Sequence, residues 1–414
     1  MNYNLRTAAL IAAGLVSSGA VALAEEGKSN PVETALSSTT ISGYVSTSAF
    51  FSLGEDSNGT LLPGRSFDGA DKIDKINLDV VKLSLEKPLA EGDWYAGYKV
   101  DLLFGPDANT LATSSVLGNN NSDFAIKQAY VALQTPVGND LIAKIGVFDT
   151  LIGYEVFEAG SNPNYSRSYA YYIEPTQHTG LLLSYAVTEW LTINAGIADS
   201  WNARINAAGA DSNTTRDFGL QTYMGSIVLT APEGAGFLKG AQLFAGVVHG
   251  LSSADSDIDA TAAGTNDSVD GDPRTSLYAG LSIPTPLEGL GVGLAYDYRF
   301  TERFRPGQDN AEEYATAFAG YLTYQATEQL KFGVRGEYAT GSAGSWGFRP
   351  SAGPDNEEIF GLTTSIDYNL WDNVLTRLEF RWDTDLASGT KGFGSPGNEE
   401  ASAYVLGLNV IYKF

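Results

Sequence analysis

The sequence predicts an all-β protein: a single transmembrane antiparallel β-barrel of about 16 strands, with short periplasmic turns and long extracellular loops. Three observations predict this fold. Strand-like segments with a period of two follow one another through most of the chain. The connections between them alternate between short and long. Charged side chains gather on one face of several strands, while apolar side chains cover the other face.

Residues 401–414 show the period of two most clearly. One face of an extended strand there carries Tyr404, Leu406, Leu408, Val410, Tyr412 and Phe414, and the other carries Val405, Gly407, Asn409, Ile411 and Lys413. A continuous apolar face with this period is typical of a strand and not of a helix. Lipid suits the first face, whereas an aqueous interior suits the amide and the charge on the second.

Similar segments recur along the chain, each close to the nine to eleven residues that cross a bilayer at a tilt. They lie near residues 39–53, 75–87, 93–104, 123–134, 141–149, 177–187, 190–200, 217–230, 239–250, 275–284, 290–300, 312–325, 329–340, 357–368, 374–384 and 401–414. No segment of comparable length predicts an amphipathic helix.

The connections sort by length along the chain. Short turns follow the even-numbered segments, at residues 89–92, 135–140, 188–189, 231–238, 285–289, 326–328 and 369–373. Long polar loops follow odd-numbered segments, such as 54–74, 105–122, 150–176, 201–216, 251–274 and 385–400. Short turns at one rim and long loops at the other are typical of outer-membrane barrels.

Six acidic residues lie between positions 255 and 272, and carboxylate oxygens suit calcium. Their spacing does not match an EF-hand calcium loop, so we expect a solvated loop tip.

The segment 376–383 indicates what the interior must supply. Its two faces carry Leu378, Phe380 and Trp382 on one side, and Arg377, Glu379, Arg381 and Asp383 on the other. Packing four charges on one face into a dry core carries a large desolvation cost. The sequence therefore predicts a water-filled lumen, with the solvated outer face of a soluble sheet as the alternative.

Composition narrows the function further. The chain has 414 residues with 25 basic and 49 acidic side chains, no cysteine and two histidines. A formal charge of −24 argues against nucleic acid as a partner. So few histidines and no thiol predict no metal site and no cofactor.

Residues 1–24 are typical of a secretory signal peptide, with an N-terminal membrane anchor as the alternative. Residues 25–38 form a polar periplasmic lead-in, and 39–414 the barrel.

Several short runs resemble the OmpL-like β-barrel porins. They are residues 81–88 (VKLSLEKP), 97–107 (GYKVDLLFGPD), 127–131 (KQAYV), 146–150 (GVFDT) and 164–168 (NYSRS). The resemblance implies a channel for small solutes in the outer membrane of a Gram-negative bacterium, with membrane lipid as a partner. It also implies a homotrimer, because trimers are common among porins with sixteen strands.

The loop at residues 150–177 differs from the other loops because it is rich in tyrosine and apolar residues. Long ordered loops are usually functional. We expect it to fold into the barrel and to narrow the pore, with Glu155, Glu158, Tyr165 and Arg167 at the constriction. An ordered cap over the rim, or a subunit contact, is the alternative.

The wall of the pore is expected to carry charges of both signs. The candidates are Lys82, Lys99, Asp101, Lys144, Asp297, Arg299, Lys331, Arg335, Glu337, Arg377, Glu379 and Arg381. Rings of charge set ion preference in pores, so the predicted function is passive diffusion filtered by size and charge. A channel specific for a sugar or an anion is the main alternative, ahead of a structural or adhesive barrel. An enzyme is not expected, because the chain lacks a G-x-S-x-G nucleophile elbow and His178 is better read as a hydrogen-bonding anchor.

Overall fold

The computed structural model describes residues 39–54, 62–89, 94–111, 123–206, 222–251, 273–303, 311–347, 356–387, 391–395 and 398–414. The predicted signal peptide (1–24) and lead-in (25–38) lie outside these residues. So do most of the turn at 89–92 and the acidic positions 255–272.

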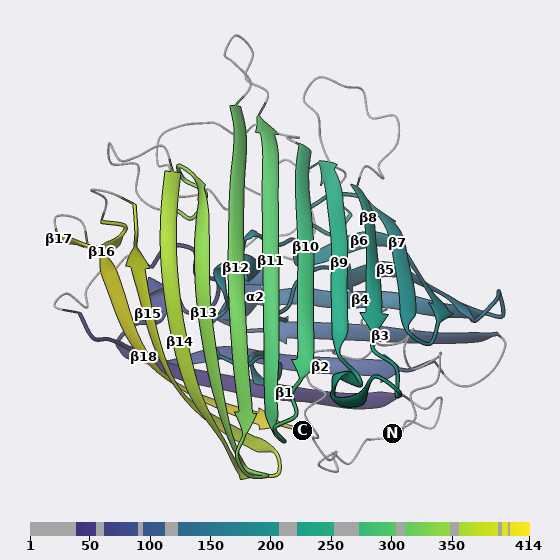
Figure 1. Cartoon of the computed structure of the whole chain (residues 1–414), viewed down its shortest axis with the longest axis horizontal. Helices are drawn as coiled ribbons and strands as arrows, with labels where there is room; N and C mark the ends of the chain where they lie inside the picture. Colours follow the sequence, from purple (N-terminus) through teal and green to yellow (C-terminus); the bar gives the residue numbers. More distant parts are fainter. Residues whose placement is uncertain are drawn as a thin grey trace.

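Sixteen of the described strands form one closed antiparallel barrel, as the sequence predicts (Figure 1). They are β1 Thr40–Ser52, β2 Lys75–Lys87, β3 Tyr95–Phe104, β4 Phe124–Thr135, β5 Leu141–Asp149, β6 Gln177–Thr188, β7 Leu191–Ala198, β8 Thr222–Thr230, β9 Gln242–Leu251, β10 Pro273–Pro284, β11 Leu290–Arg303, β12 Ala311–Gln325, β13 Leu330–Ser342, β14 Asn356–Trp371, β15 Val374–Asp385 and β18 Ser402–Lys413. Each pairs with its neighbours in the chain, and β15 continues to β18.

The first and last strands close the ring. Strand β1 pairs antiparallel with β18, from Tyr44 opposite Lys413 to Ser52 opposite Val405. Closure leaves no unpaired edge, which a bilayer requires because it offers no water to satisfy backbone groups.

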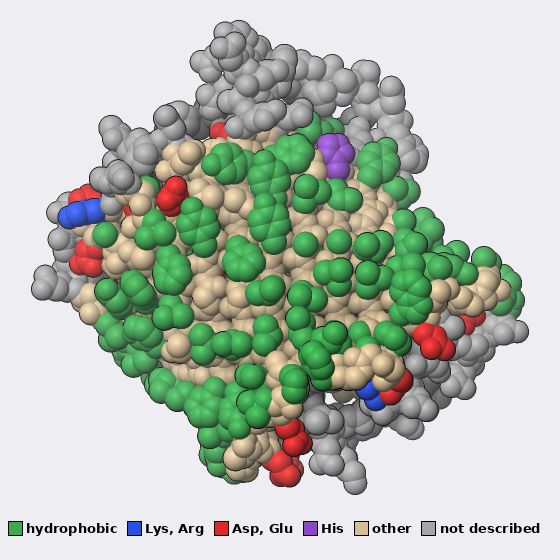
Figure 2. Space-filling model, viewed as in Figure 1, with side chains coloured by type: hydrophobic (Ala, Val, Ile, Leu, Met, Phe, Trp, Pro, Cys, Tyr) green, Lys and Arg blue, Asp and Glu red, His purple; other side chains and the backbone are tan. Residues whose placement is uncertain are grey.

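The strands turn apolar side chains outward, as the period of two predicts. In β18, Tyr404, Leu408 and Tyr412 are 40–47% exposed, whereas Val405 and Asn409 on the other face are buried. Hydrophobic side chains cover the visible face of the barrel, and charged ones lie near its edges (Figure 2). An outer surface of this kind is suited to lipid.

The two rims differ in their connections. The short-turn rim carries the exposed tryptophans Trp94, Trp190 and Trp371, in positions where membrane-interface aromatics are enriched. The long-loop rim carries the short helices η2 (Ala70–Lys72), α2 (Pro106–Leu111), η3 (Ala159–Ser161) and α3 (Tyr169–Ile173), while η4 (Gly236–Leu238) lies in a turn of the opposite rim. Within the described ranges, no helix is long and apolar enough to cross a membrane.

Segments from several long loops pack inside the barrel. Phe67, Tyr169, Trp346 and Phe393 are each at most 3% exposed, and they belong to hydrophobic clusters shared with the inner wall. Phe393 starts a small hairpin, β16 (Phe393–Ser395) with β17 (Asn398–Glu400), in a loop where the sequence showed no strand pattern. The interior is therefore more filled than alternation along the strands alone indicates.

Candidate functional site: the third loop inside the barrel

The third loop, residues 150–176, runs through the interior from the end of β5 to the start of β6. Near its start, Ile152 reaches β9, where a Cβ added to Gly246 would lie 2.7 Å from Ile152 Cγ2. Later, the carbonyl oxygen of Pro163 accepts a hydrogen bond of 2.9 Å from Ser365 on β14. Helix α3 then packs against β11, β12 and β13. The loop thus touches strands that are far apart around the ring, and it lies within the ring.

Arg335 on β13 makes several contacts between the wall and this loop. Its guanidinium forms an ion pair with Glu155 (2.9 Å) and donates hydrogen bonds to the Ser166 carbonyl (2.6 Å) and the Arg167 carbonyl (3.2 Å). The same group pairs with Glu337 on its own strand at 2.9 Å. Arg335 is fully buried. It therefore holds the loop, and its charge is compensated by two carboxylates.

Strand β15 binds the loop in the same way. Arg377 pairs with Asp367 at 2.5 Å and donates to the carbonyl of Ala159 at 3.0 Å. Glu379 accepts a hydrogen bond of 2.5 Å from the backbone N–H of Tyr165. These side chains point inward, as the alternation predicts, but they meet loop backbone instead of open water.

Arg381 and Asp383 complete a buried network on β15. Arg381 pairs with Asp383 at 3.0 Å and donates to the carbonyl of Arg167 at 2.8 Å. Arg65 from the first long loop also pairs with Asp383 and, at 2.9 Å, with Asp68. The expectation that the charges on this strand need water is corrected here: opposite charges and loop carbonyls satisfy them instead.

Glu158 joins the loop to a second part of the charged wall, on β2 and β4. Its carboxylate lies 2.5 Å from Lys82 on β2 and 3.5 Å from Lys127 on β4. Lys82 also pairs with Asp101 at 3.1 Å. Burial alone would raise the pKa of Glu158, but the attraction of Lys127 and Lys82 outweighs it and lowers the pKa. Glu158 is therefore ionised at neutral pH.

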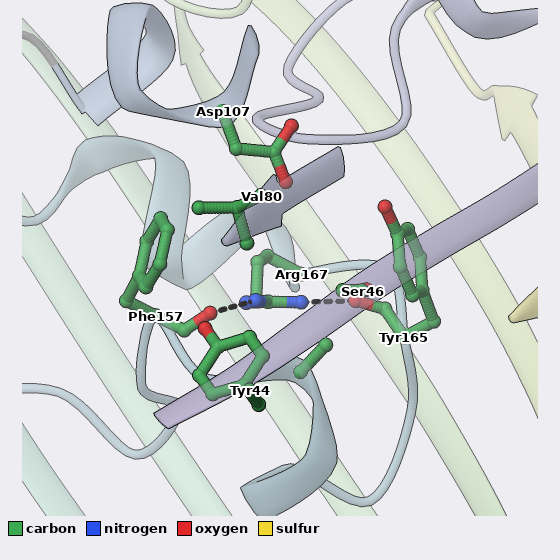
Figure 3. A pocket seen from close by; sticks show the side chains of 8 residues that line it. Tyr44, Ser46, Val80, Asp107, Phe157, Tyr165 and Arg167 are labelled. Carbon is green, nitrogen blue, oxygen red and sulfur yellow. Dashed lines mark hydrogen bonds between the residues drawn. The ribbon is translucent and has the colours of Figure 1, made fainter. Parts of the chain in front are cut away.

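Arg167 holds the middle of the loop in its folded shape. Its guanidinium donates to the carbonyls of Val156, Phe157 and Tyr165, and it lies over the ring of Phe67 with 5.0 Å to the centroid. Figure 3 shows the guanidinium between two of these carbonyls, beside a small cavity. The role of this residue in the structure is to fix loop conformation, because its donors are used within the loop.

The remaining predicted wall residues point inward around this network. Lys99 pairs with Glu86 at 3.2 Å, and both are partly exposed. Lys144 is buried and lies over a tyrosine ring, with 4.7 Å to the centroid. Arg299 and Lys331 are half-buried. Lys99, Glu86 and Lys331 are thus among the inward charges that the loop does not fully bury.

Asp297 on β11 meets an acid from the loop. Its side chain is hydrogen-bonded to Glu174, and Glu155 lies close enough to repel both. Burial raises the pKa of Glu174 well above its usual value, and the charge of Asp297 raises it further. Two buried carboxyl groups in contact cannot both be ionised, so the contact holds a proton.

The sequence interpretation missed a second ionic cluster from the first two long loops. Lys72 lies 2.9 Å from Asp79 and 2.6 Å from Asp107, and all three are buried. The loop 54–74 was read only as a polar connection. Phe67, between Arg65 and Asp68, was the available signal that part of it packs against protein.

His178 anchors the end of the loop. Its Nε2 lies 3.2 Å from the hydroxyl of Thr150, which places the two ends of the loop side by side. This contact agrees with the reading of His178 as an anchor.

The fold and this site together define a class. A closed barrel of sixteen strands with an apolar outer face, an ionic inner wall and a long loop folded inside it has the architecture of an outer-membrane porin. A family profile described as "Putative beta-barrel porin-2, OmpL-like" matches residues 38–414. The chain belongs to this family, and it is an outer-membrane channel.

Comparison with solved structures agrees on the fold. The outer membrane channel DcaP of Acinetobacter baumannii has a TM-score of 0.59 at 12% identity, over 93% of this chain and 99% of that chain. The trimer form of OmpT of Vibrio cholerae has a TM-score of 0.54 at 12% identity, over 91% and 99%. An anion-selective porin from Comamonas acidovorans has a TM-score of 0.53 at 11% identity, over 91% and 99%. No curated protein sequence matched the chain.

Proposed function

We propose that this channel supports passive diffusion of small hydrophilic solutes and ions, and that the third loop sets the size limit. The observation that carries the proposal is the set of contacts from Arg335 to Glu155 and to the backbone of the loop. A loop fixed across the lumen in this way reduces the cross-section left for solutes. The partly exposed charges, Lys99, Glu86 and Lys331, are proposed to set ion preference.

We also propose that the channel works as a homotrimer, that residues 1–24 are a cleaved signal peptide, and that the protein is not an enzyme. The trimer form of a structural neighbour supports the first point. The family and the fold, which are those of a channel, support the last.

A solute-size series tests the proposed mechanism. Purified protein in liposomes should admit uncharged solutes at rates that fall steeply with solute size. Replacing residues 155–167 by a short Gly-Ser linker should move the cutoff to larger solutes, because the contacts of the loop with the wall are lost. A heat-dependent mobility shift on gels shows that the barrel has formed. An unchanged cutoff in a folded variant would contradict the role of the loop.

A further inference from the structure

The inner wall of the barrel is divided into a charged part and an uncharged part. Strands β2 to β5 and β13 to β15 each turn at least one charged side chain inward. By contrast, the inward side chains of β7, β8 and β9 are uncharged: Thr192, Asn194 and Ala198; Thr222, Met224, Ser226, Val228 and Thr230; Gln242, Phe244 and Val248. The halves of β10 to β12 nearest the short turns continue this uncharged surface.

Aromatic rings lie on this uncharged surface. Tyr154 of the third loop stacks on Tyr321 of β12, with ring centroids 4.3 Å apart and an interplanar angle of 17°. The Tyr154 hydroxyl lies over Gly293, where an added Cβ would be 2.0 Å away, and it is hydrogen-bonded to Ser282. Tyr154, Ser282 and Phe244 are partly exposed. We call Asn194, Ser226, Phe244, Ser282, Tyr321 and Tyr154 the uncharged patch.

One polar atom of the patch has hydrogen-bonding capacity left over. Asn194 donates to Ser226 at 3.0 Å, but its Oδ1 has no partner within the described residues. The Asn194 side chain is 2% exposed and points inward. A buried polar atom without a partner costs about 1–3 kcal/mol, so a hydroxyl-bearing ligand that reached Asn194 would gain by pairing with it.

The arginines of β13 and β15 offer little to a solute, because the loop engages them, as Arg335 and Arg377 show through their bonds to loop carbonyls. A charged solute that passes between the loop and the uncharged patch would lose water without gaining an opposite charge. An uncharged solute with many hydroxyl groups avoids that cost. Proteins also bind uncharged ligands of this kind through aromatic rings together with a few well-placed polar groups.

We propose that the uncharged patch is a binding site for uncharged polyhydroxylated solutes, that is, sugars. The proposal rests on the proposed diffusion function and gives it a substrate class. The patch carries two partly exposed aromatic rings, Tyr154 and Phe244, with hydroxyl and amide groups beside them, and it lies beside the part of the loop that narrows the lumen.

Three solutes of similar size test the substrate class. D-glucose, D-glucuronate and D-glucosamine differ mainly in charge, and their entry into liposomes can be compared through the reconstituted channel. D-glucose should enter about tenfold faster than either charged analogue, which corresponds to about 1.4 kcal/mol. Equal or faster entry of a charged analogue would overturn the proposal.

Current block tests the patch itself. Sugar added to a planar bilayer should reduce the ion current in a saturable way, and Phe244→Ala should raise the half-blocking concentration about tenfold. Tyr324→Ala is the matched control, because Tyr324 is an aromatic residue on the outer face, 40% exposed, and should leave the block unchanged. Ion current without saturable block, or block unaffected by Phe244→Ala, would overturn this inference and leave the proposed function standing. Absence of both ion current and solute entry would contradict the proposed function itself.

Discussion

Replacing Arg335 by methionine removes several contacts between the wall and the third loop. The side chains of Glu155 and Glu337 are each 1% exposed, and the substitution leaves both without the cation that they share. Breaking one partner of a buried ion pair costs about 3–5 kcal/mol. The lost hydrogen bonds to the Ser166 and Arg167 carbonyls fall within the same cost, because one guanidinium makes all of these contacts.

We expect Arg335→Met to loosen residues 155–167 of the loop from the wall. The barrel should stay closed, since no strand pairing depends on this side chain. Single-channel recordings should then show a larger and noisier conductance, and the loop should become sensitive to protease. Lys239→Met is the control: Lys239 pairs with Glu233, but both side chains are at least 50% exposed, and such pairs are worth about 0–1 kcal/mol.

A double-mutant cycle separates the ion pair from the rest of the contact. Glu155→Gln alone should weaken the attachment of the loop to the wall. The double variant with Arg335→Met should lose less stability than the sum of the two single losses, with a coupling energy of about 1–3 kcal/mol. If Arg335→Met left conductance and protease resistance as they are in the wild type, or changed them no more than Lys239→Met does, Arg335 would not hold the loop.

Three further changes test other parts of the structure. Gly293→Ala should displace the Tyr154 ring, since the new Cβ would lie 2.0 Å from its hydroxyl, and should alter single-channel conductance; unaltered conductance would speak against this packing. Burial raises the pKa of Asp107 to about 7, against the attraction of its lysine partner. The folded state therefore keeps a proton that the unfolded state releases above its ordinary pKa of 3.8, so this contribution to stability falls as pH rises from about 4 to about 7. Asp107→Asn should remove that dependence in thermal unfolding followed by circular dichroism, and a profile equal to the wild type would contradict it. Trp346→Ala empties a fully buried site beside Tyr169, with ring centroids 5.7 Å apart, and should destabilise the long-loop rim by about 3–5 kcal/mol in the same assay; a change below 1 kcal/mol would argue against this core.

The strands and the barrel could be predicted because one physical rule governs every strand. Side chains alternate between lipid and interior, so a period of two fixes both the strand and the direction of each side chain. The same alternation puts Arg335, Arg377 and Arg381 on the inner face, and the structure has all three buried. The lengths of the connections then fixed which strand ends share a rim.

The interior could not be predicted in the same way, because its contacts depend on the path of the loops. Arg335 meets Glu155 across a sequence separation of 180 residues, and no periodicity links the two. Alternation says that Arg381 points inward, but not that Arg65 from the first loop lies beside its partner Asp383. The charges that were expected to face water are instead paired for this reason.

The most direct test of the account is the conductance of the purified wild-type protein in a planar bilayer. We expect discrete, stepwise ion currents, and larger steps when residues 155–167 are replaced by a short linker. A folded, heat-modifiable protein that conducts no ions with or without this part of the loop would contradict the central claim that the barrel encloses a path for solutes.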